Sequence, residues 1–472
     1  MTPYNFTDLS QSGGVKCKLR HNINAVKLLR QLDQEQRLPT ELEQSVLAQF
    51  TGWGTVASAI NREVLDLLPN TDLNSDNAFQ TPREIISSVW EVLSHLGFQS
   101  GRIADPAANI GLWAGFQKPE YRSNSEWLLV EIDPTAKAIA CYLHPDAVVY
   151  GSNAQQQIGF EHTDIPKDSF DLVVSNFPFG VTAPFDPTYQ KVVKSLHNYF
   201  WAKSLALTAP AGLIASITSV GTMDSTPEFC QYLANQGARL IGAVRLPDTA
   251  FKCMNTSVTA DLIILQKMNE PQNALSWGEV VDSSIKDGYG VPLKINRYFA
   301  ENPEKVLGEL TKCVLYGGER IAVAGDGRDL KQSIIDAFSH IEPCYTPPKH
   351  VRSLSQNLLP AELVGLDPYR YVSREGKIYQ YRPGEGLCLV TQHAERIAAG
   401  LRLKQTLDNL VQAEIKEAFN CEIWRSELNR LYQQFVKCYG ELLNRRKQPS
   451  TLSVFSDDSE LTTSGGDKRP LK

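Results

Sequence analysis

The sequence predicts an α/β fold: a mainly parallel β-sheet covered by helices on both faces, a helical N-terminal region and an α+β C-terminal extension. The first observation is a series of short, uninterrupted apolar runs, which is the pattern of strands buried on both faces. The second is that helix-like stretches lie between several of these runs, as in parallel sheets. The predicted strands cover residues 101–105, 127–130, 148–150, 170–175, 213–217, 240–244 and 260–265.

The helical N-terminal region is expected over residues 1–70. Ala25 to Leu32 and Glu41 to Phe50 carry apolar residues at helical spacing, and Pro39-Thr40 is a helix-start signal before the second stretch. The sheet domain is expected over residues 71–270. Hydrophobic residues make up 42% of the 472-residue chain, which is ample for a sizeable core.

The first predicted strand of the sheet domain, 101–105, leads into a turn of small residues. This turn contains Pro106, Ala107, Asn109 and Gly111 and precedes a helix start. Small residues let a ligand approach the backbone closely, and a helix N-terminus offers free N–H groups. The segment is therefore a candidate ligand-binding loop.

The second predicted strand ends in acidic residues. Its apolar run is followed by Glu131 and Asp133, and Glu131 follows Asp105 at about the spacing found in nucleoside-binding βαβ units. An acid at this place in such a unit accepts hydrogen bonds from ribose hydroxyls. The sequence therefore favours a nucleoside-containing ligand.

The predicted strand 170–175 ends in Asn176-Phe177-Pro178-Phe179, followed by Gly180. In open α/β sheets, ligands bind at the carboxyl ends of the strands. An Asn oxygen and a neighbouring backbone carbonyl can accept hydrogen bonds from a planar exocyclic amine, while an aromatic ring stacks on the base. Methyl transfer to the amino group of adenine needs these features. A strand followed by a Pro-containing turn is the alternative interpretation, because so short a motif also occurs by chance.

These segments together resemble N6-adenine DNA methyltransferases of the gamma arrangement. In that family a Tyr-Thr-Pro-like motif precedes the cofactor loop, and an Asn-Pro-Pro-Tyr-like motif follows it. Here Phe79-Gln80-Thr81-Pro82, Asp105 to Gly111 and Asn176 to Phe179 occur in that order. The resemblance covers residues 79–267. It implies a Rossmann-like class I methyltransferase sheet, S-adenosyl-L-methionine as cofactor and double-stranded DNA as substrate.

A closer resemblance is to the methyltransferase module of very large helicase–methyltransferase proteins of phages and plasmids, the defence-against-restriction type. It extends over most of the chain, up to about residue 445. The segments that carry it are Asn22 to Ala25, Gly52 to Gly54, Asn176 to Gly180, Ile217 to Ser219, Thr222 to Asp224, Val244 to Pro247, Ala250-Phe251, Leu428 to Tyr432 and Phe435.

The resemblance implies a role for each candidate residue. Asn176, Pro178 and Phe179 would be catalytic, and Phe179 would stack on an adenine flipped out of the duplex. Phe251 is a second candidate contact for the base, although a core aromatic fits its position equally well. The implied cofactor-binding residues are Thr81, Asp105, Pro106, Ala107, Asn109, Gly111, Glu131, Asp133 and Asn176.

Three positions depart from the family pattern, and one of them, Phe177 in place of the usual Pro or Val, is a mild change because Pro178 and Phe179 are retained. Asn109 stands where Gly is usual, although Asn tolerates a left-handed backbone better than other non-glycine residues, and Gln80 stands where an aromatic is usual. These departures keep open a catalytically silent module that binds DNA or a partner without turnover. A further alternative is an N-methyltransferase acting on RNA or on protein glutamine, since similar motifs occur in such enzymes.

Charge and cysteine content indicate how the chain could bind DNA and in which cellular compartment it works. With a net charge of −6, DNA must be reached through a local basic patch. The nine cysteines are scattered without a Cys-x-x-Cys pair, which suits a reducing cytoplasm and argues against a metal site. The sequence shows neither a signal peptide nor an apolar run of membrane-spanning length. We therefore expect a cytoplasmic, DNA-binding enzyme without a metal and without a membrane partner.

The C-terminal part is expected to hold three segments: an accessory extension (271–350), a small β element followed by long helices (351–447), and a disordered tail (448–472). Basic residues along 394–447 are the predicted phosphate contact, although a charged solvated face is the favoured interpretation. The sequence contains no Gly-x-x-x-x-Gly-Lys-Ser/Thr loop. We therefore expect a separate helicase or translocase subunit as a partner.

Overall fold

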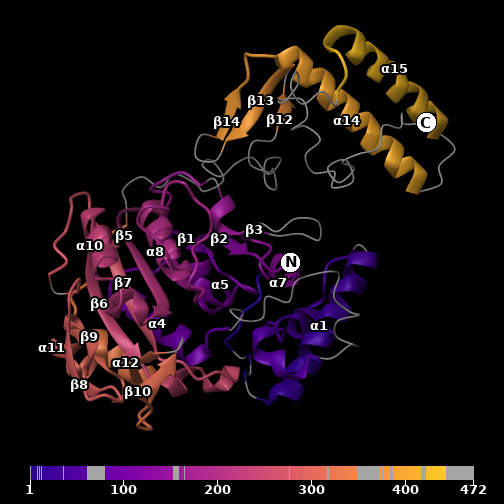
Figure 1. Cartoon of the computed structure of the whole chain (residues 1–472). Coiled ribbons are helices and arrows are strands. Elements are labelled where there is room, and N and C mark those ends of the chain that lie inside the picture. The colour runs from indigo at the N-terminus through magenta and orange to yellow at the C-terminus, as the bar shows by residue number, and fades with distance from the viewer. Residues whose placement is uncertain are drawn as a thin grey trace. The chain divides into compact units, whose positions relative to one another are not determined.

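The structure is a computed structural model in which two compact units can be distinguished, Met1–Pro360 and Ala361–Lys472 (Figure 1), and each is described by itself. Phe79 and the predicted tail at 448–472 lie outside the described residues. The finer division into five segments stays a prediction. The structure describes residues 2–7, 9, 11, 13–35, 37–60, 80–151, 159–163, 165–275, 277–315, 318–347, 371–374, 376–382, 386–415 and 421–442.

A seven-stranded sheet lies at the centre of the first unit, in the order β3-β2-β1-β4-β5-β7-β6. Strands β1 to β5 pair in parallel, whereas β7 runs antiparallel to both β5 and β6. This mainly parallel sheet, with one reversed strand near its edge, confirms the predicted class I methyltransferase fold. Its strands are β1 (Arg102–Asp105), β2 (Glu126–Glu131), β3 (Val148–Gly151), β4 (Phe170–Asn176), β5 (Thr208–Ser219), β6 (Ala238–Leu246) and β7 (Ala260–Lys267).

Both faces of the sheet are buried, which explains the uninterrupted apolar runs. In β4, Leu172 and Val174 belong to one core cluster, and Val173 between them belongs to the other. The helices that connect and cover the strands are α4 (Arg83–His95), α5 (Leu112–Phe116), α6 (Pro119–Arg122), α7 (Pro134–Leu143), α8 (Leu196–Leu207), α9 (Gly221–Asp224) and α10 (Pro227–Asn235), with 3-10 turns η3 (Phe160–His162) and η4 (Asp248–Met254).

The predicted N-terminal helices are present as α1 (Val15–Glu35) and α2 (Glu41–Leu47), followed by the 3-10 turn η1 (Gly54–Ala59). Thr40 begins α2 as predicted, because its side chain accepts the Glu43 N–H while the Glu43 carboxylate accepts the Thr40 N–H. The apolar face of α1 packs into the first core cluster, so this region is part of the first unit.

The accessory extension also belongs to the first unit. It contains two antiparallel hairpins and three short helical segments: β8 (Val280–Lys286), β9 (Pro292–Asn296), α11 (Arg297–Glu301), η5 (Pro303–Lys305), β10 (Glu309–Leu315), β11 (Gly318–Ala324) and α12 (Leu330–Phe338).

The second unit contains the predicted small β element and the two long helices. These are β12 (Tyr371–Arg374), β13 (Lys377–Arg382), β14 (Gly386–Leu389), α14 (Ala394–Ile415) and α15 (Cys421–Tyr439). Of all the helices in the described ranges, none has the length and apolar character needed to cross a membrane.

Candidate active site

The Asn176–Phe179 tetrad lies at the carboxyl end of β4, between β1 and β5. Phe177 turns into the protein, where its ring lies 5.5 and 5.1 Å from two aromatic rings of α8. Asn176, Pro178 and Phe179 remain partly exposed. The free position of the motif is thus an apolar anchor, and the three predicted catalytic residues stay accessible at the end of the strand.

Asp105 ends the neighbouring strand β1 and is fully buried. Its Oδ1 accepts hydrogen bonds from Ser175 Oγ at 2.7 Å and from the Ala107 N–H at 3.2 Å. Its Oδ2 has no hydrogen-bond partner among the described residues. Burial raises the pKa of Asp105 to about 7. A buried acceptor without a partner, where the strand order reverses between β1 and β4, is suited to a ligand that carries a donor or a positive charge.

Glu131 ends β2 and binds the candidate loop from the other side. One carboxyl oxygen accepts the Asn109 N–H at 2.6 Å, and the other accepts the Asp133 N–H at 2.7 Å. Burial, followed by the charge of Asp133, raises the pKa of Glu131 to about 8. The Asp133 carboxylate itself begins α7 by accepting the Ala136 N–H at 2.7 Å. Glu131 is therefore both a possible ligand contact and a support of the loop, whereas Asp133 serves as a helix cap.

Two of the departures from the family pattern, Gln80 and Asn109, are hydrogen-bonded to each other. Asn109 has a left-handed backbone, with φ of 51°, and its Oδ1 accepts the Ile110 N–H at 2.9 Å and the Gln80 Nε2 at 3.0 Å. The same Gln80 Nε2 donates to the Phe50 carbonyl at 2.6 Å. Sequence reasoning missed this pairing. The only signal for it was that two unusual polar residues occurred together in adjoining motifs.

The ring of the buried His144 packs against Gly111. The Nε2 of His144 donates to the Ile110 carbonyl at 2.9 Å, and Arg122 Nη2 lies 3.3 Å from its Nδ1. Burial, then the Arg122 charge, lowers the pKa of His144 to about 3, so the ring is neutral. A Cβ atom at Gly111, whose φ is 81°, would lie 2.4 Å from this ring. Glycine is therefore required here for backbone conformation and for space.

The remaining predicted site residues show no unusual geometry. Pro106 is buried, Ala107 is partly exposed, and the Thr81 carbonyl accepts a hydrogen bond from Gln11 at 3.2 Å. Phe251, the second candidate contact for the base, is only 2% exposed and belongs to the first core cluster. Its ring is covered by apolar neighbours and cannot stack on a base in this conformation. This finding favours the core-aromatic interpretation.

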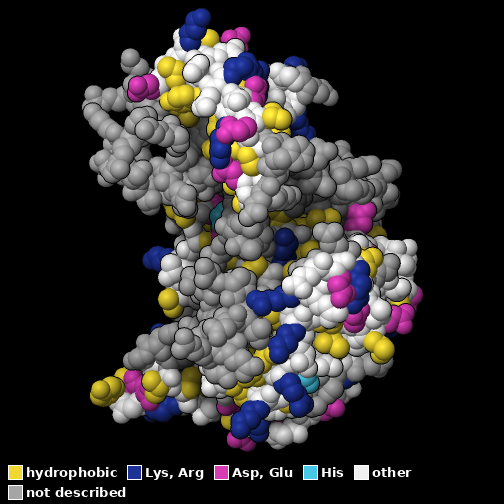
Figure 2. All heavy atoms as spheres, turned by 90° about the vertical axis from the view of Figure 1, so that its right-hand side faces the viewer, with side chains coloured by type: hydrophobic (Ala, Val, Ile, Leu, Met, Phe, Trp, Pro, Cys, Tyr) yellow, Lys and Arg dark blue, Asp and Glu magenta, His cyan; other side chains and the backbone are white. Residues whose placement is uncertain are grey.

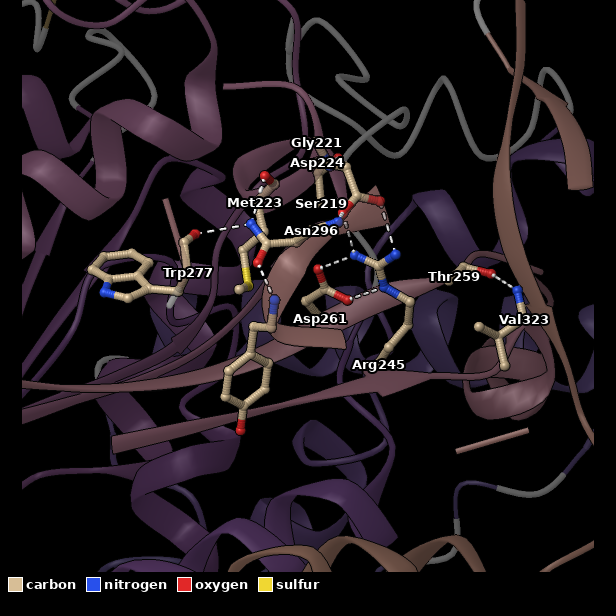
Figure 3. Close-up of polar contacts among 11 residues, drawn as sticks. Ser219, Gly221, Met223, Asp224, Arg245, Thr259, Asp261, Trp277, Asn296 and Val323 are labelled. Atoms are coloured by element: carbon tan, nitrogen blue, oxygen red, sulfur yellow. Dashed lines mark hydrogen bonds and ion pairs between the residues drawn. The ribbon is translucent and has the colours of Figure 1, made fainter. Parts of the chain in front are cut away.

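Two of the segments that carried the family resemblance form a buried ionic network (Figure 3). Arg245 of β6 is fully buried and donates to both oxygens of Asp261 and of Asp224, at 2.8–2.9 Å. The Asn296 N–H also donates to Asp224 at 2.8 Å, and the Phe299 ring lies 4.3 Å from the guanidinium. Because Asn296 and Phe299 come from the accessory extension, this network fastens the extension to the sheet.

An ordered loop follows the tetrad directly. Its ends are joined by hydrogen bonds from the Leu196 N–H to the Gly180 carbonyl at 3.0 Å and from the Ala183 N–H to the Lys194 carbonyl at 2.8 Å. The loop exposes Phe185 by 79%. In the part of the chain that the structure describes, no other phenylalanine is largely exposed.

No family model matches the chain. Defense against restriction protein B of Escherichia phage P1 is 27% identical over 256 residues, which are 53% of this chain and 10% of the phage protein. Among solved structures, a type I restriction-modification methyltransferase subunit from Streptococcus thermophilus is 14% identical over 47% of this chain and 53% of its own, with a TM-score of 0.33. The EcoKI M protein is 17% identical over 56% and 57%, with a TM-score of 0.32.

This chain thus spans about a tenth of the phage protein and little more than half of each solved chain. Because both TM-scores are low, the fold assignment depends on the strand order and strand directions of the sheet itself. The resemblance to defence-against-restriction proteins is confirmed as a distant sequence similarity. The chain therefore has a class I methyltransferase fold, and about half of it is distantly similar in sequence to a phage defence-against-restriction protein.

Proposed function

We propose that the chain transfers a methyl group from S-adenosyl-L-methionine to N6 of adenine in double-stranded DNA. The observation that carries this proposal is the accessible Asn176, Pro178 and Phe179 at the end of β4, beside the unpartnered Asp105 carboxyl oxygen at the end of β1. Neighbouring strands at which the strand order reverses form the usual ligand-binding place of open α/β sheets.

The residues of the candidate loop fit the cofactor. When bound, S-adenosyl-L-methionine supplies an electrophilic methyl group on a positively charged sulfur. The free oxygen of Asp105 and the remaining lone pairs of Glu131 can accept hydrogen bonds from its amino and ribose groups. Asn109 and Gly111 allow the backbone to approach closely because both adopt positive φ.

The tetrad fits an exocyclic amine. The Asn176 Oδ1 and the carbonyl at Pro178 would accept hydrogen bonds from the two N–H groups of adenine N6, which favours the pyramidal form that can attack. Both acceptors also stabilise the positive charge that develops on this nitrogen, so they bind the transition state more strongly than the ground state. Phe179 would stack on the flipped base. No titratable base is needed before attack, in agreement with the composition of the tetrad.

The loop that follows the tetrad supports a nucleic acid as substrate. Phe185 and Val181 are 79% and 70% exposed, and Lys191 and Lys194 are also exposed. Apolar side chains inserted between base steps and cations near phosphates are common in proteins that distort a duplex. Such distortion is required here, because a base within an intact duplex cannot reach the end of β4.

The test is incubation of the purified chain with labelled cofactor and mixed-sequence DNA, followed by mass spectrometry of the nucleosides. N6-methyladenine is the expected product, and methylcytosine would overturn the assignment. The same assay with RNA and with glutamine-containing peptides tests the alternative substrates.

The Gln80–Asn109 pair is the observation that favours a second candidate, a module that binds DNA or a partner without turnover. This pair places polar groups where the family pattern has an aromatic and a glycine. Calorimetric titration with the cofactor separates the candidates: the enzyme must bind it, whereas a silent module with an altered loop gives no heat.

We also propose that the chain works with a separate DNA-translocating subunit, as the resemblance to helicase–methyltransferase proteins implies. Affinity purification from the native host at modest salt should recover a helicase-like protein. Recovery of the chain alone, with full sequence-specific methylation by the isolated protein, would contradict a partner.

A further inference from the structure

Helix α1 carries a row of basic side chains on its solvent-exposed face. Lys16, Arg20, Lys27 and Arg30 are exposed and follow one another at helical spacing, with the exposed amide of Asn24 between them. The sequence contains no acidic residue from the start of α1 until the helix has nearly ended. We call Lys16, Arg20, Asn24, Lys27 and Arg30 the α1 basic row.

Three of the four cations in this row have no acidic partner nearby within the described ranges. Lys16, Arg20 and Lys27 form no ion pair with any residue that the structure describes. Figure 2 faces the side of the molecule on which α1 lies in Figure 1, and Lys and Arg side chains recur across that face. The first unit therefore has local positive charge even though the whole chain carries a net charge of −6.

The C-terminal helices, which the sequence offered as a candidate phosphate contact, behave differently. In the second unit, Arg425 pairs with Glu414 and Glu422, and Arg430 pairs with Glu427. Cations with acidic partners on the same helices have little charge left for phosphates. This supports the solvated-face interpretation for Arg425 and Arg430 of α15, whereas Lys16, Arg20 and Lys27 of α1 have no such partners among the described residues.

Helix stability does not account for the α1 basic row. Lys16 and Arg20 lie in the first turns, close to the positive end of the helix dipole, where cations are unfavourable. They are also four residues apart, a spacing at which like charges repel. The arrangement lowers the stability of the helix slightly, so helix stability does not explain it.

The opposite face of α1 forms hydrogen bonds with other segments of the first unit. Lys18 donates to the Cys253 carbonyl in η4, and Asn22 Nδ2 donates to the Gly52 carbonyl at 2.9 Å while its Oδ1 accepts the Thr51 N–H at 2.8 Å. The preceding residue of that segment, Phe50, receives the Gln80 hydrogen bond that leads to the candidate loop. The row is thus held rigidly on the same unit as the candidate active site.

We propose that the α1 basic row binds the phosphate backbone of the duplex whose adenine reaches Asn176. This inference rests on the proposed function and names the surface on which its substrate lies. The helix has 21 residues and is about 31 Å long, so the row can contact several phosphates along one backbone. Three unpaired cations, an amide donor and no intervening acid are the features that phosphates recognise.

The test uses the full chain and a triple variant, Lys16→Gln, Arg20→Gln and Lys27→Gln. Binding to a fluorescent duplex is measured by anisotropy between 50 and 200 mM salt. The slope of log affinity against log salt should fall in magnitude by about 0.9 for each phosphate that the variant no longer neutralises, hence by up to about 2.7. Calorimetric titration with S-adenosyl-L-methionine should give unchanged affinity.

A matched control removes the same charge from another surface. Its substitutions are Lys294→Gln, Arg297→Gln and Lys312→Gln, at exposed cations of the accessory extension that have acidic partners. The control should keep the wild-type slope. An equal reduction of the slope in both triple variants would show that only the net charge matters and would overturn the proposal.

Other outcomes separate this inference from the proposed function. Wild-type slope and affinity in the α1 variant, together with adenine methylation by the wild type, would overturn the row alone. Reduced DNA binding in the variant, together with a wild type that does not methylate DNA, would support the α1 basic row as a DNA-binding surface and would contradict the proposed methyltransferase activity. A wild type that binds polyglutamate but not DNA would show that the row serves an acidic protein and would overturn the inference.

Discussion

Cofactor binding should depend strongly on pH through Asp105 and Glu131. Burial raises the pKa of Asp105 to about 7 and that of Glu131 to about 8, above the usual carboxyl values of 3.8 and 4.5. At pH 7 the protein without ligand therefore holds a proton on Asp105 about half of the time and on Glu131 most of the time. A positively charged cofactor favours their ionised forms, so its binding must release these protons and should become tighter as the pH rises.

The size of the effect follows from the two pKa values. If both carboxyls must ionise, affinity should rise by about 500-fold between pH 6 and pH 8, about 10-fold through Asp105 and about 50-fold through Glu131. About two protons should be released per cofactor at pH 6 and about 0.6 at pH 8. The same carboxyls lower the stability of the ligand-free protein as the pH rises from about 4 to about 8, because the unfolded chain releases these protons first.

Isothermal titration calorimetry at pH 6, 7 and 8, in buffers with different enthalpies of ionisation, measures both affinity and proton release. Asp105→Asn should leave only the larger, Glu131-linked part of the pH dependence, and Glu131→Gln only the smaller part. The second substitution should also weaken binding at every pH, since the amide nitrogen of Gln cannot accept one of the two backbone N–H groups that now bond to Glu131.

A dissociation constant that stays flat between pH 6 and pH 8 in the wild type would refute this reasoning. It would mean either that water enters the site and keeps both carboxylates ionised, or that the cofactor does not contact them. Equal slopes in the wild type and in both variants would exclude these carboxyls as the titrating groups.

Three further predictions concern the tetrad, the loop and the ionic network. Asn176→Ala should lower turnover by about two orders of magnitude or more and leave the cofactor affinity nearly unchanged, because the missing acceptor acts mainly in the transition state. Steady-state kinetics measure the turnover and calorimetry the affinity; unchanged turnover would contradict this role of Asn176. Gln80→Ala and Asn109→Gly, made singly and together, should show a coupling of about 0.5–1.5 kcal/mol in the free energy of unfolding, and strict additivity would mean that their hydrogen bond contributes nothing. Arg245→Met should cost about 3–5 kcal/mol in urea unfolding because it removes the cationic partner of the buried Asp261 and of the partly buried Asp224, whereas Arg297→Met, at a half-exposed ion pair, should cost about 1 kcal/mol or less; similar losses of stability would contradict the assigned role of burial.

The local sequence was sufficient to predict the sheet and the place of the candidate site. Strands buried on both faces have apolar residues at successive positions, as in the run that ends at Asn176, so their positions along the chain could be predicted without knowledge of their neighbours. The cap at Thr40 is likewise set within four residues. Because parallel strands have their carboxyl ends at one edge, the same pattern predicted that Asp105, Glu131 and the tetrad lie together.

Contacts between residues far apart in the chain could be settled only by the tertiary structure. The Gln80–Asn109 bond joins two motifs, and the Arg245 network depends on the register between β6 and β7. Phe251 has the same apolar side chain whether it faces a ligand or the core, and only the packing around η4 shows that it is buried. The basic spacing of α1 is visible in the sequence. Whether acids from other segments neutralise it depends on how the chain folds back on itself, because charges interact through space and not along the sequence.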